Sequence, residues 1–497
     1  MKTSLLLPFL AIVGLFSSHS MHAQIELGAD IDGEAPGDEL GWSVSLSADG
    51  SRLAVGAPRN DGGGTDAGQA RVYAWDGMDW IQLGSDLDGE GPEDHFGESV
   101  SLSADGNRLA VGAPENDGSG IFAGKVRVFE WDGSNWTYLG AGINGAMLLD
   151  HFGTSVALSA DGNRLAVGAP TSTGGGTEPN TGQVRVYEWD EVGWAQLGAD
   201  LNGAIVGGNF GRSLSLSADG NWLAVGAAYA DVDGELGAGQ VKVFAWDGEE
   251  WTPLGTELHG EHTGDLFGKS VSLSADGQTL AVGVPLNDAI GTEAGLVEVF
   301  VWGGAEWDLL GAPVYGEGWS DQSGTSVSLS ADGRRIAIGA THNDQTGLNA
   351  GHVRVFAWNG SAWTKLGADL NGEAMADFSG RSVSLSADGL RVAIGATGND
   401  GNGELAGQVR VYEVSVVSTE GLDPERQLWV YPNPTTGRLE WSGPPVSMVR
   451  IVDGVGKVFR EGAPAGSMLD LSDLPGGVYF LQIWLAEGVV VRKVVKW

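Results

Sequence analysis

One stretch of this 497-residue chain recurs seven times at a nearly constant spacing. At residues 96–114 it reads Phe-Gly-Glu-Ser-Val-Ser-Leu-Ser-Ala-Asp-Gly-Asn-Arg-Leu-Ala-Val-Gly-Ala-Pro. Its Ser-Ala-Asp-Gly core places an aspartate at 49, 105, 161, 219, 276, 332 and 388, so that neighbouring copies lie 56 to 58 residues apart. A period of this length indicates an array of one supersecondary unit whose copies bury their apolar faces against one another.

Each copy predicts four short antiparallel strands. In the second copy, apolar and polar residues alternate over 99–103 and 125–131, and shorter apolar runs cover 109–111 and 136–139. Ala-Asp-Gly and Asp-Gly make tight turns between the first and second and between the third and fourth strands. The other two connections, 115–124 and 141–151, are longer loops. Four antiparallel strands in such a repeat are typical of a propeller blade.

The two ends of the repeat array complement each other. The seventh copy has a third strand at 408–413, but no Trp-x-x-Leu-Gly segment follows it. Residues 24–33, Gln-Ile-Glu-Leu-Gly-Ala-Asp-Ile-Asp-Gly, match the fourth-strand segment 80–89. We therefore expect an all-β, seven-bladed propeller over 24–416 in which the N-terminal strand completes the last blade and closes the ring.

The repeat resembles a known family. Phe-Gly at 96, 152, 210 and 267, with Gly-Ala-Pro at 56, 112 and 168, is similar to the FG-GAP repeats of the integrin α-subunit propeller. Some copies drift, with Leu40-Gly41 and Ser379-Gly380 in place of Phe-Gly and Gly395-Ala-Thr397 in place of Gly-Ala-Pro. The third and fourth strands also resemble kelch repeats. Either resemblance implies a propeller.

Calcium binding is one property in which the chain departs from the integrin pattern. Integrin-type repeats often carry an Asp-x-Asp-x-Asp-Gly loop between the first two strands, whereas this chain has Ser-Ala-Asp-Gly with one carboxylate. Because Ca²⁺ takes six or more oxygen ligands, the family's calcium site does not carry over to this turn.

The N-terminus predicts an export signal. Lys2 precedes an apolar run of 12 residues at 5–16, and Ala23 is a small residue at the expected cleavage position. We expect a signal peptide over 1–23, cut before Gln24. Twelve residues are too few to span a bilayer as a helix, and no later segment approaches 18 apolar residues. The mature chain is therefore not expected to be an integral helical membrane protein.

The C-terminal module differs in composition from the repeats. After a linker at 417–427, residues 428–497 predict five to seven short strands and a small β-sandwich. The opening Tyr431-Pro432-Asn433-Pro434, an Asp-Gly hairpin at 453–454, the Leu-Pro-Gly476-Gly477-Val-Tyr run and a basic end resemble the type A C-terminal sorting domain of the type IX secretion route. The resemblance implies the type IX machinery as partner. It also implies delivery to the medium or to the outer surface of a Gram-negative bacterium.

Charge and cysteine content exclude several classes of partner. The formal net charge is −38, of which residues 24–427 carry about −40 because the two flanking segments are each near +1. Nucleic acids and anionic membranes require basic patches, so neither is expected as a partner. The chain has no cysteine, and a disulfide framework is therefore impossible.

The candidate binding residues lie on the two long connections of the blades, which meander geometry places on one face. Three large aromatic residues break the repeat there, Phe122, Tyr229 and Trp319. They predict a contact surface for a sugar or protein, and packing between neighbouring loops is the alternative. No cofactor is expected. Ca²⁺ is the alternative, with Asp61 and Asp66 as ligands, although the recurring Asn-Asp pairs also suit simple turn chemistry.

Histidines do not indicate a further site. His95 and His151 occupy the same repeat position, and the spacing of His259, His262, His342 and His352 does not match that of metal ligands on a shared strand face.

Two functional classes fit these observations. The first is a non-catalytic, secreted or surface-bound binding propeller with an adhesive role, which the homogeneity of the repeats favours. The second is an extracellular enzyme, such as one that degrades polysaccharides, with its site on the propeller axis. A tight cluster of repeat-breaking polar residues at the axis favours the enzyme, and scattered aromatic residues on the rim favour adhesion.

Overall fold

The computed structural model describes residues 21–417, 429–431, 435, 437–442, 446, 448–453, 457–462, 464, 468–485 and 488–496. One compact unit spans Ala23–Ser415, and a second contains the C-terminal residues from Val416 onward. All regular elements within the described residues are strands, and none is a helix. The predicted all-β class is therefore confirmed. The predicted signal peptide lies outside the described residues, apart from positions 21–23.

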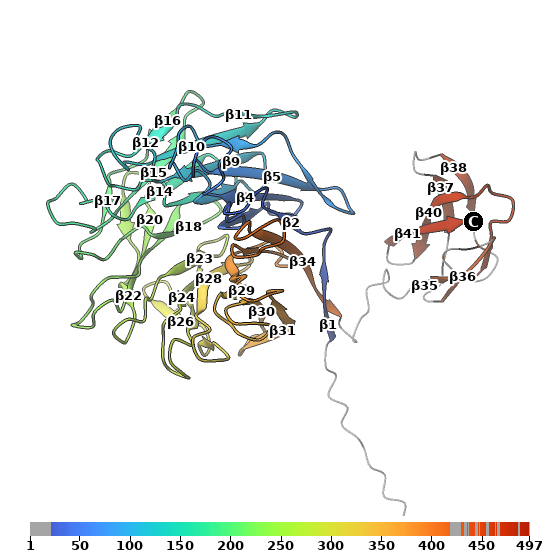
Figure 1. Ribbon diagram of the computed structural model, residues 1–497. Helices are drawn as coiled ribbons and strands as arrows, with labels where there is room; N and C mark the ends of the chain where they lie inside the picture. Colours follow the sequence, from blue (N-terminus) through green and yellow to red (C-terminus); the bar gives the residue numbers. More distant parts are fainter. Residues whose placement is uncertain are drawn as a thin grey trace, which may run out of the picture. The chain divides into compact units, whose positions relative to one another are not determined.

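The first unit consists of seven antiparallel sheets of four strand positions each, which follow one another around a wheel (Figure 1). Sheets of the first three copies are β3 (Ser43–Leu46), β4 (Arg52–Ala57), β5 (Gln69–Trp75) and β6 (Trp80–Gln82); β8 (Ser99–Leu102), β9 (Arg108–Ala113), β10 (Lys125–Trp131) and β11 (Trp136–Tyr138); β13 (Ser155–Leu158), β14 (Arg164–Ala169), β15 (Gln183–Trp189) and β16 (Trp194–Gln196). The next three are β18 (Ser213–Leu216), β19 (Trp222–Ala227), β20 (Gln240–Trp246) and β21 (Trp251–Pro253); β23 (Ser270–Leu273), β24 (Thr279–Val284), β25 (Leu296–Trp302) and β26 (Trp307–Leu309); β28 (Ser323–Leu329), β29 (Arg335–Ala340), β30 (His352–Trp358) and β31 (Trp363–Asn371).

The fourth strand differs from the prediction because six of the seven copies extend it past a break, the first five and the seventh. In the second copy, the chain leaves β11, turns at Gly140 with a φ of 79°, and pairs again with β10. The predicted loop 141–151 therefore contains a short strand. In the first five copies these extra strands are β7 (Leu87–Asp88), β12 (Ile143–Asn144), β17 (Leu201–Asn202), β22 (Leu258–His259) and β27 (Val314–Tyr315). A side chain at Gly140 would meet Trp189 of the next blade at 2.7 Å, which favours glycine at this break.

The last sheet is built from both ends of the propeller sequence. It contains β32 (Ser379–Leu385), β33 (Arg391–Ala396) and β34 (Gln408–Val417), and its outer strands are β1 (Met21–Glu26) and β2 (Ile31–Asp32). Leu27 N–H donates to the carbonyl oxygen of Val411 at 2.8 Å, and Ile31 pairs with Val409. Figure 1 shows β2 beside β34. The predicted ring closure by the N-terminal strand is confirmed.

Gln24 takes a position that tryptophan holds in the other copies. Trp136 donates its indole N–H to the carbonyl oxygen of Leu83 in the preceding blade at 2.9 Å. In the seventh blade, the side-chain amide of Gln24 donates to Leu366 in the same way at 3.2 Å. The first residue after the predicted cleavage point is thus part of the closing contact.

The apolar core lies between neighbouring blades. One cluster combines Val72 of the first blade with Leu109, Val111 and Phe129 of the second, all nearly inaccessible to water. Burial of this kind is the main favourable term in folding, and it requires each blade to have two neighbours. The tryptophan pairs close the clusters at the outer edge, as between Trp131 and Trp136, whose rings are 5.4 Å apart.

The glycines of the Phe-Gly and Gly-Ala-Pro motifs allow adjacent blades to approach each other. Gly153 has a φ of 96°, which side chains other than glycine rarely adopt. Gly112 faces it across the blade interface, and a Cβ on Gly112 would lie 2.0 Å from the carbonyl oxygen of Gly153. That same carbonyl accepts a hydrogen bond from the Ser99 hydroxyl at 2.8 Å. The motif is therefore explained by backbone contact near the axis.

The tight turns between the first two strands form a closed ring of hydrogen bonds. In each copy the alanine N–H of Ser-Ala-Asp-Gly donates to the same alanine's carbonyl in the next blade. Ala48 donates to Ala104 and, after five further steps, Ala387 donates back to Ala48 at 2.8 Å. Such a circuit closes only if the blades complete a full turn.

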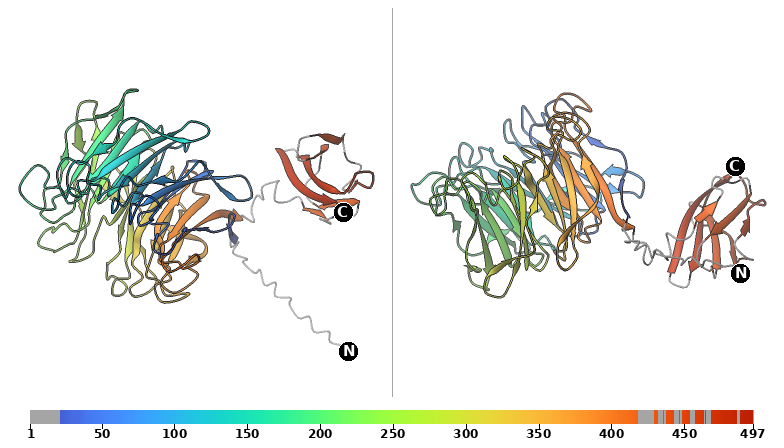
Figure 2. Two further views of the ribbon diagram at one scale, coloured as in Figure 1. Left: turned by 45° about the horizontal axis from the view of Figure 1, so that its top comes forward. Right: turned by 90° about the horizontal axis from the view of Figure 1, so that it is seen from below.

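The second unit contains two antiparallel sheets, drawn in red in Figure 2. The first has β35 (Trp429–Tyr431), β36 (Arg438–Ser442) and β39 (Met468–Asp470), and the second has β37 (Met448–Asp453), β38 (Val458–Gly462), β40 (Gly477–Leu485) and β41 (Gly488–Lys496). Leu439 and Trp441 of the first sheet share one buried cluster with Ile451, Leu481 and Ile483 of the second. A core shared by two sheets is what a β-sandwich requires. The sandwich arrangement itself stays a prediction.

Candidate functional site at the axis of the propeller

The two long connections of each blade meet at one end of the wheel. In the link before the second blade, Asp94 accepts a hydrogen bond from the side-chain amide of Asn116, which begins the β9–β10 loop, at 2.8 Å. The β9–β10 loop also contacts the next link, where Leu149 N–H donates to the carbonyl oxygen of Ile121 at 2.8 Å. The structure thus places links and loops together, and we refer to this end as the long-loop face.

One residue per blade faces the axis at the start of the first strand, directly after the positive-φ glycine. Residues from all seven blades line an axial pocket of about 280 Å³, and six of these seven positions contribute to it directly. We call the set the axial ring. Its members are Trp42, Glu98, Thr154, Arg212, Lys269, Thr325 and Arg381.

The axial ring concentrates positive charge. It holds three cations, Arg212, Lys269 and Arg381, against the single carboxylate of Glu98. Among the described residues, none of the three cations has an ion-pair partner within 4.0 Å. The Arg381 guanidinium instead lies over the ring of Trp42, 3.9 Å from its centroid, and the indole N–H of Trp42 donates to Glu98. The tryptophan therefore holds both charged groups in place through different parts of its ring system.

Partial burial shifts the titration of these groups. The pKa of Lys269 is lowered to about 8. Burial is the main cause, the positive charges of Arg212 and Arg381 add to it, and the Glu98 carboxylate partly opposes it. Burial also lowers the pKa of Arg381. It raises the pKa of Glu98, because desolvation outweighs the attraction of Arg381 and Arg212. A carboxyl group with a raised pKa and an amine with a lowered pKa thus share one channel.

A second cavity adjoins the ring on the long-loop face. It has a volume of about 410 Å³ and shares Lys269, Thr325 and Arg381 with the axial ring. Its other walls are largely apolar, with Leu266, Pro285, Leu286 and Phe378. His342 lies against Phe378 with ring centroids 5.5 Å apart. We call the axial ring and this cavity together the axial mouth.

The three aromatic residues predicted to bind lie on this same face but are not joined by any ring contact in the described part of the chain. Phe122 stacks on His151 with centroids 5.9 Å apart, which is a contact between a loop and the next link. Trp319 is 78% exposed and lies against Gly291 in a neighbouring loop. Tyr229 is 40% exposed. Their role as a binding surface stays a prediction.

The candidate cation ligands take part in a turn. The Asp61 carboxylate accepts a hydrogen bond from the backbone N–H of Asp66 at 2.9 Å. The same bond recurs in other copies, for example from Phe122 N–H to Asp117 at 2.9 Å. This geometry is the turn chemistry that the sequence left open as an alternative.

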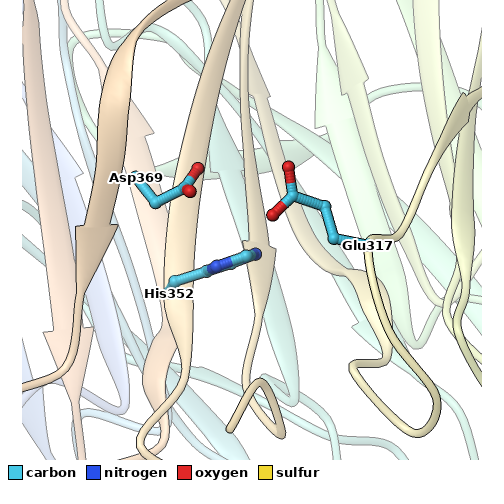
Figure 3. A group of neighbouring side chains, drawn as sticks. All are labelled: Glu317, His352 and Asp369. Carbon is cyan, nitrogen blue, oxygen red and sulfur yellow. The ribbon is translucent and has the colours of Figure 1, made fainter. Parts of the chain in front are cut away.

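A carboxylate–histidine cluster shares no residue with the axial ring. Figure 3 shows its three side chains, Glu317, His352 and Asp369, pointing toward one another. Glu317, His352 and Asp369 place ligand atoms within 4.8 Å of one another, and neither ring nitrogen of the fully buried His352 has a hydrogen-bond partner. Burial, with the charge of Arg354, lowers the pKa of His352 to about 4. These three groups suit a divalent cation in type.

Two cationic side chains already pair with the carboxylates of that cluster. The Lys365 ammonium lies 3.3 Å from Glu317 and contacts Asp369, and Arg354 lies 3.3 Å from Glu317. A metal ion there would have to displace Lys365. Sequence spacing did not indicate this cluster, because its members come from a link and two different strands.

The axial ring was missed in sequence reasoning, although a signal for it exists. Each ring residue stands between a constant glycine and a constant serine, as in Gly97-Glu98-Ser99 and Gly380-Arg381-Ser382. A variable position inside an otherwise repeated strand shows where the copies differ in role.

Comparisons with known families agree with the repeat and the tail. The FG-GAP repeat model matches residues 29–73 and 87–129, and the model of the secretion system C-terminal sorting domain matches residues 429–497. The chain contains FG-GAP repeats and a type IX sorting domain. Within that domain, Gly476 and Gly477 lead into β40 and Tyr431 ends β35, whereas Pro432, Asn433 and Pro434 lie outside the described residues.

Whole-chain comparisons add little about activity. No curated protein matches the sequence. One similar solved structure is the periplasmic gluconolactonase PpgL of Pseudomonas aeruginosa, at 21% sequence identity and a TM-score of 0.45, over 67% of this chain and 85% of that chain. In the described residues, no helix is long and apolar enough to cross a membrane.

Proposed function

We propose that this protein is an exported, non-catalytic binding propeller that holds an extracellular ligand at the axial mouth. The sorting domain implies export to the cell surface or the extracellular space. The observation that carries the binding site is the axial ring, where the seven copies differ while the residues on either side repeat. Variation at positions where the side chains of a repeated, rigid scaffold face a shared cavity is typical of a binding site.

The rim of the long-loop face extends this site. Trp319 and Tyr229 are exposed on loops there, and Phe122 is held by His151. These aromatic residues supply contact area at low entropy cost for a ligand that reaches beyond the axis. An adhesive role, in which a surface-displayed propeller attaches to a glycan or matrix protein, is the function that these features support best.

A binding screen tests the proposal. The full chain is applied to arrays of glycans and matrix proteins, with and without Ca²⁺, together with the variant Phe378→Ala in the axial mouth. A matched control is Trp136→Phe, which changes an aromatic residue at the outer edge of a blade. We expect the mouth variant to lose binding that the control retains. Binding that survives Phe378→Ala and also Arg381→Gln excludes the axial mouth.

Export by the type IX route to the outer surface of a Gram-negative cell is the second part of the proposal. Removal of residues 428–497 should leave the propeller in the periplasm. Cell fractionation and surface proteolysis of the native host measure this. Surface display of the truncated chain contradicts the assignment.

A hydrolytic enzyme is the second candidate function, and two observations favour it. The first is the axial ring itself, because a cluster of repeat-breaking polar residues at the axis is the feature expected of an enzyme, whereas the exposed Trp319 and Tyr229 on the rim are the feature expected of adhesion. The second is the titration of two ring residues. Glu98 has a raised pKa and Lys269 has a pKa of about 8, and both face the axial channel. A carboxyl group with a raised pKa and an amine with a lowered one are the kinds of group that serve as proton donor and acceptor in hydrolysis. Release of reducing ends from polysaccharides, lost in Glu98→Gln but not in Asp105→Asn at the opposite end of the strand, would replace the binding proposal by this one.

A further inference from the structure

The axial ring has a charge that the rest of the propeller does not share. The chain has a formal net charge of −38, yet the ring carries two more positive than negative groups. Elsewhere, arginines on the third strands pair with carboxylates, as Arg71 does with Glu34 at 3.6 Å and Arg410 with Glu373 at 3.6 Å. Within the part of the chain that the structure describes, the axial cations have no such partners, so their charge is available to a ligand.

Unpaired cations in a confined channel cost free energy. Taking a charge out of water is compensated only by a partner charge and by hydrogen bonds. The three cations also repel one another, which contributes to the lowered pKa of Lys269. An anion at the axis removes both costs, because it pairs with all three groups at once.

Among the described residues, the ring side chains whose donors are free of hydrogen bonds are the three cations. The ring threonines already donate to backbone carbonyls, Thr154 to His151 at 2.7 Å and Thr325 to Gln322 at 2.8 Å. The first serine of each strand is likewise committed to the next blade, as Ser99 is to Gly153. Arg212 and Arg381 each offer a planar fork of donors that matches a carboxylate or sulfate group.

The walls of the adjoining cavity indicate what carries the anion. Phe378, Leu266 and Leu286 form an apolar wall within the same 410 Å³ space that Lys269 and Arg381 enter. A bare inorganic ion makes no use of such a wall. A sugar with an acid group has both an apolar C–H face and an anionic group, and one to a few residues fit volumes of this order.

We infer that the axial ring binds the carboxylate or sulfate group of an acidic saccharide, with Arg212, Lys269 and Arg381 as its partners and the Phe378 wall against the sugar ring. This inference rests on the proposed binding role of the axial mouth and names its ligand class. Glu98 repels the anion when ionised, so that binding is accompanied by proton uptake at this carboxyl group.

Calorimetric titration of the full chain tests the inference. The probes are a galacturonic acid trisaccharide, a sulfated galactose trisaccharide, the neutral galactose trisaccharide and inorganic sulfate. We expect one or both acidic trisaccharides to bind, at least tenfold more tightly than the neutral one and than sulfate, with affinity falling as salt is added. Which acidic probe binds distinguishes carboxylate from sulfate.

Variants separate the axial cations from general electrostatics. Arg381→Gln and Arg212→Gln should each weaken the acidic trisaccharide at least tenfold. Arg334→Gln, which removes an exposed arginine at the tight turn between β28 and β29, should leave the affinity unchanged. Two ring variants are used because Arg381 also packs on Trp42 and its loss alone can disturb the channel.

The outcomes distinguish this inference from the proposed function. Equal affinity for neutral and acidic trisaccharides, or equal loss in Arg334→Gln, overturns the charge argument. Equal affinity for inorganic sulfate and the trisaccharides overturns the saccharide part. If array ligands bind the Phe378→Ala variant and both ring variants as tightly as the unchanged protein, the axial mouth is not the binding site, and the proposed function fails instead.

Discussion

The two ends of the first strand in each blade have opposite characters. At the tight-turn end, Ser-Ala-Asp-Gly is repeated in all seven copies, and its backbone forms a closed circuit of hydrogen bonds. At the other end, the axial ring holds a tryptophan, a glutamate, two threonines, two arginines and a lysine. The distance between these ends is only a few residues. At the tight-turn end the alanine contacts its own counterpart in the next blade, and at the axial end the side chains face a shared cavity.

The two ends also differ in whether their polar side chains have partners within the protein. Each turn aspartate is used locally, as when Asp105 accepts hydrogen bonds from the Ser103 hydroxyl at 2.6 Å and from Asn107 N–H at 2.9 Å. The axial cations are left without ion-pair partners in the described chain. Polar groups that are satisfied at one end and unsatisfied at the other are expected where one end is structural and the other binds.

The largest predicted effect removes the closure on which both ends depend. Deletion of residues 24–33 takes away half of β1 and all of β2, including the buried Ile31 of β2. We expect the free energy of unfolding to fall by more than the ~2–5 kcal/mol typical of truncating one buried isoleucine. The exposed edge of β34 should then cause aggregation. Calorimetry and size-exclusion chromatography measure both, and an unchanged melting temperature contradicts closure by this strand.

The second prediction is that Lys269 of the axial ring lowers the stability of the fold while it contributes to ligand binding. The pKa of Lys269 is about 8 in the folded protein, compared with an ordinary value of 10.5. The charged ammonium group therefore destabilises the folded state below pH 8. This destabilisation disappears as the pH rises from about 8 to 10.5. Lys269→Met should therefore stabilise the protein at pH 7 by about 1–3 kcal/mol while weakening the acidic saccharide. Denaturation at pH 7 and pH 10 checks it, because the gain should shrink at the higher pH.

The third prediction concerns the pH dependence of binding. As the pH rises through about 8, Lys269 loses its proton, and affinity for the acidic saccharide should fall roughly fivefold, or about 1 kcal/mol for one lost charge. His342, in the adjoining cavity, stays neutral over this range because burial lowers its pKa. Protonation of Glu98, whose pKa is raised, should strengthen binding on the acid side. The Lys269→Met variant should lose the fall in affinity near pH 8.

The smallest effects lie at the uniform end. In six copies a serine hydroxyl accepts a hydrogen bond from a leucine N–H of the next blade, as Ser272 does from Leu329 at 2.9 Å. In the third copy, Ala157 offers no hydroxyl to Leu216. We expect Ser272→Ala to cost about 0.5–1.5 kcal/mol and Ala157→Ser to gain a similar or smaller amount. Neither should alter saccharide affinity, and a tenfold change in affinity would remove the distinction between the two ends.

Much of the fold could be predicted from the sequence because the repeat shows which residues face which neighbour. Gln24–Gly33 matched the missing fourth strand, and Leu27 indeed pairs with Val411. The break at Gly140 was not predicted, since its cause is the tryptophan of the adjacent blade. Only packing between blades reveals that a side chain there would collide.

The axial site was harder to predict for the opposite reason. Its members stand about 56 residues apart, and a repeat draws attention to what is constant. Arg381 and Trp42 are separated by almost the whole propeller and meet only because the ring closes. The cluster of Glu317, His352 and Asp369 depends in the same way on three segments that are close in space but irregularly spaced in the chain.

The seam between β2 and β34 has a consequence for synthesis. The residues of β2 are synthesised before the first blade, and those of β34 only after six blades have followed. Until then the opening strand has no lasting partner, and long-range pairing of this kind is slow. The sorting domain is translated after β34, so it emerges from the ribosome only once all seven blades of the propeller have been synthesised.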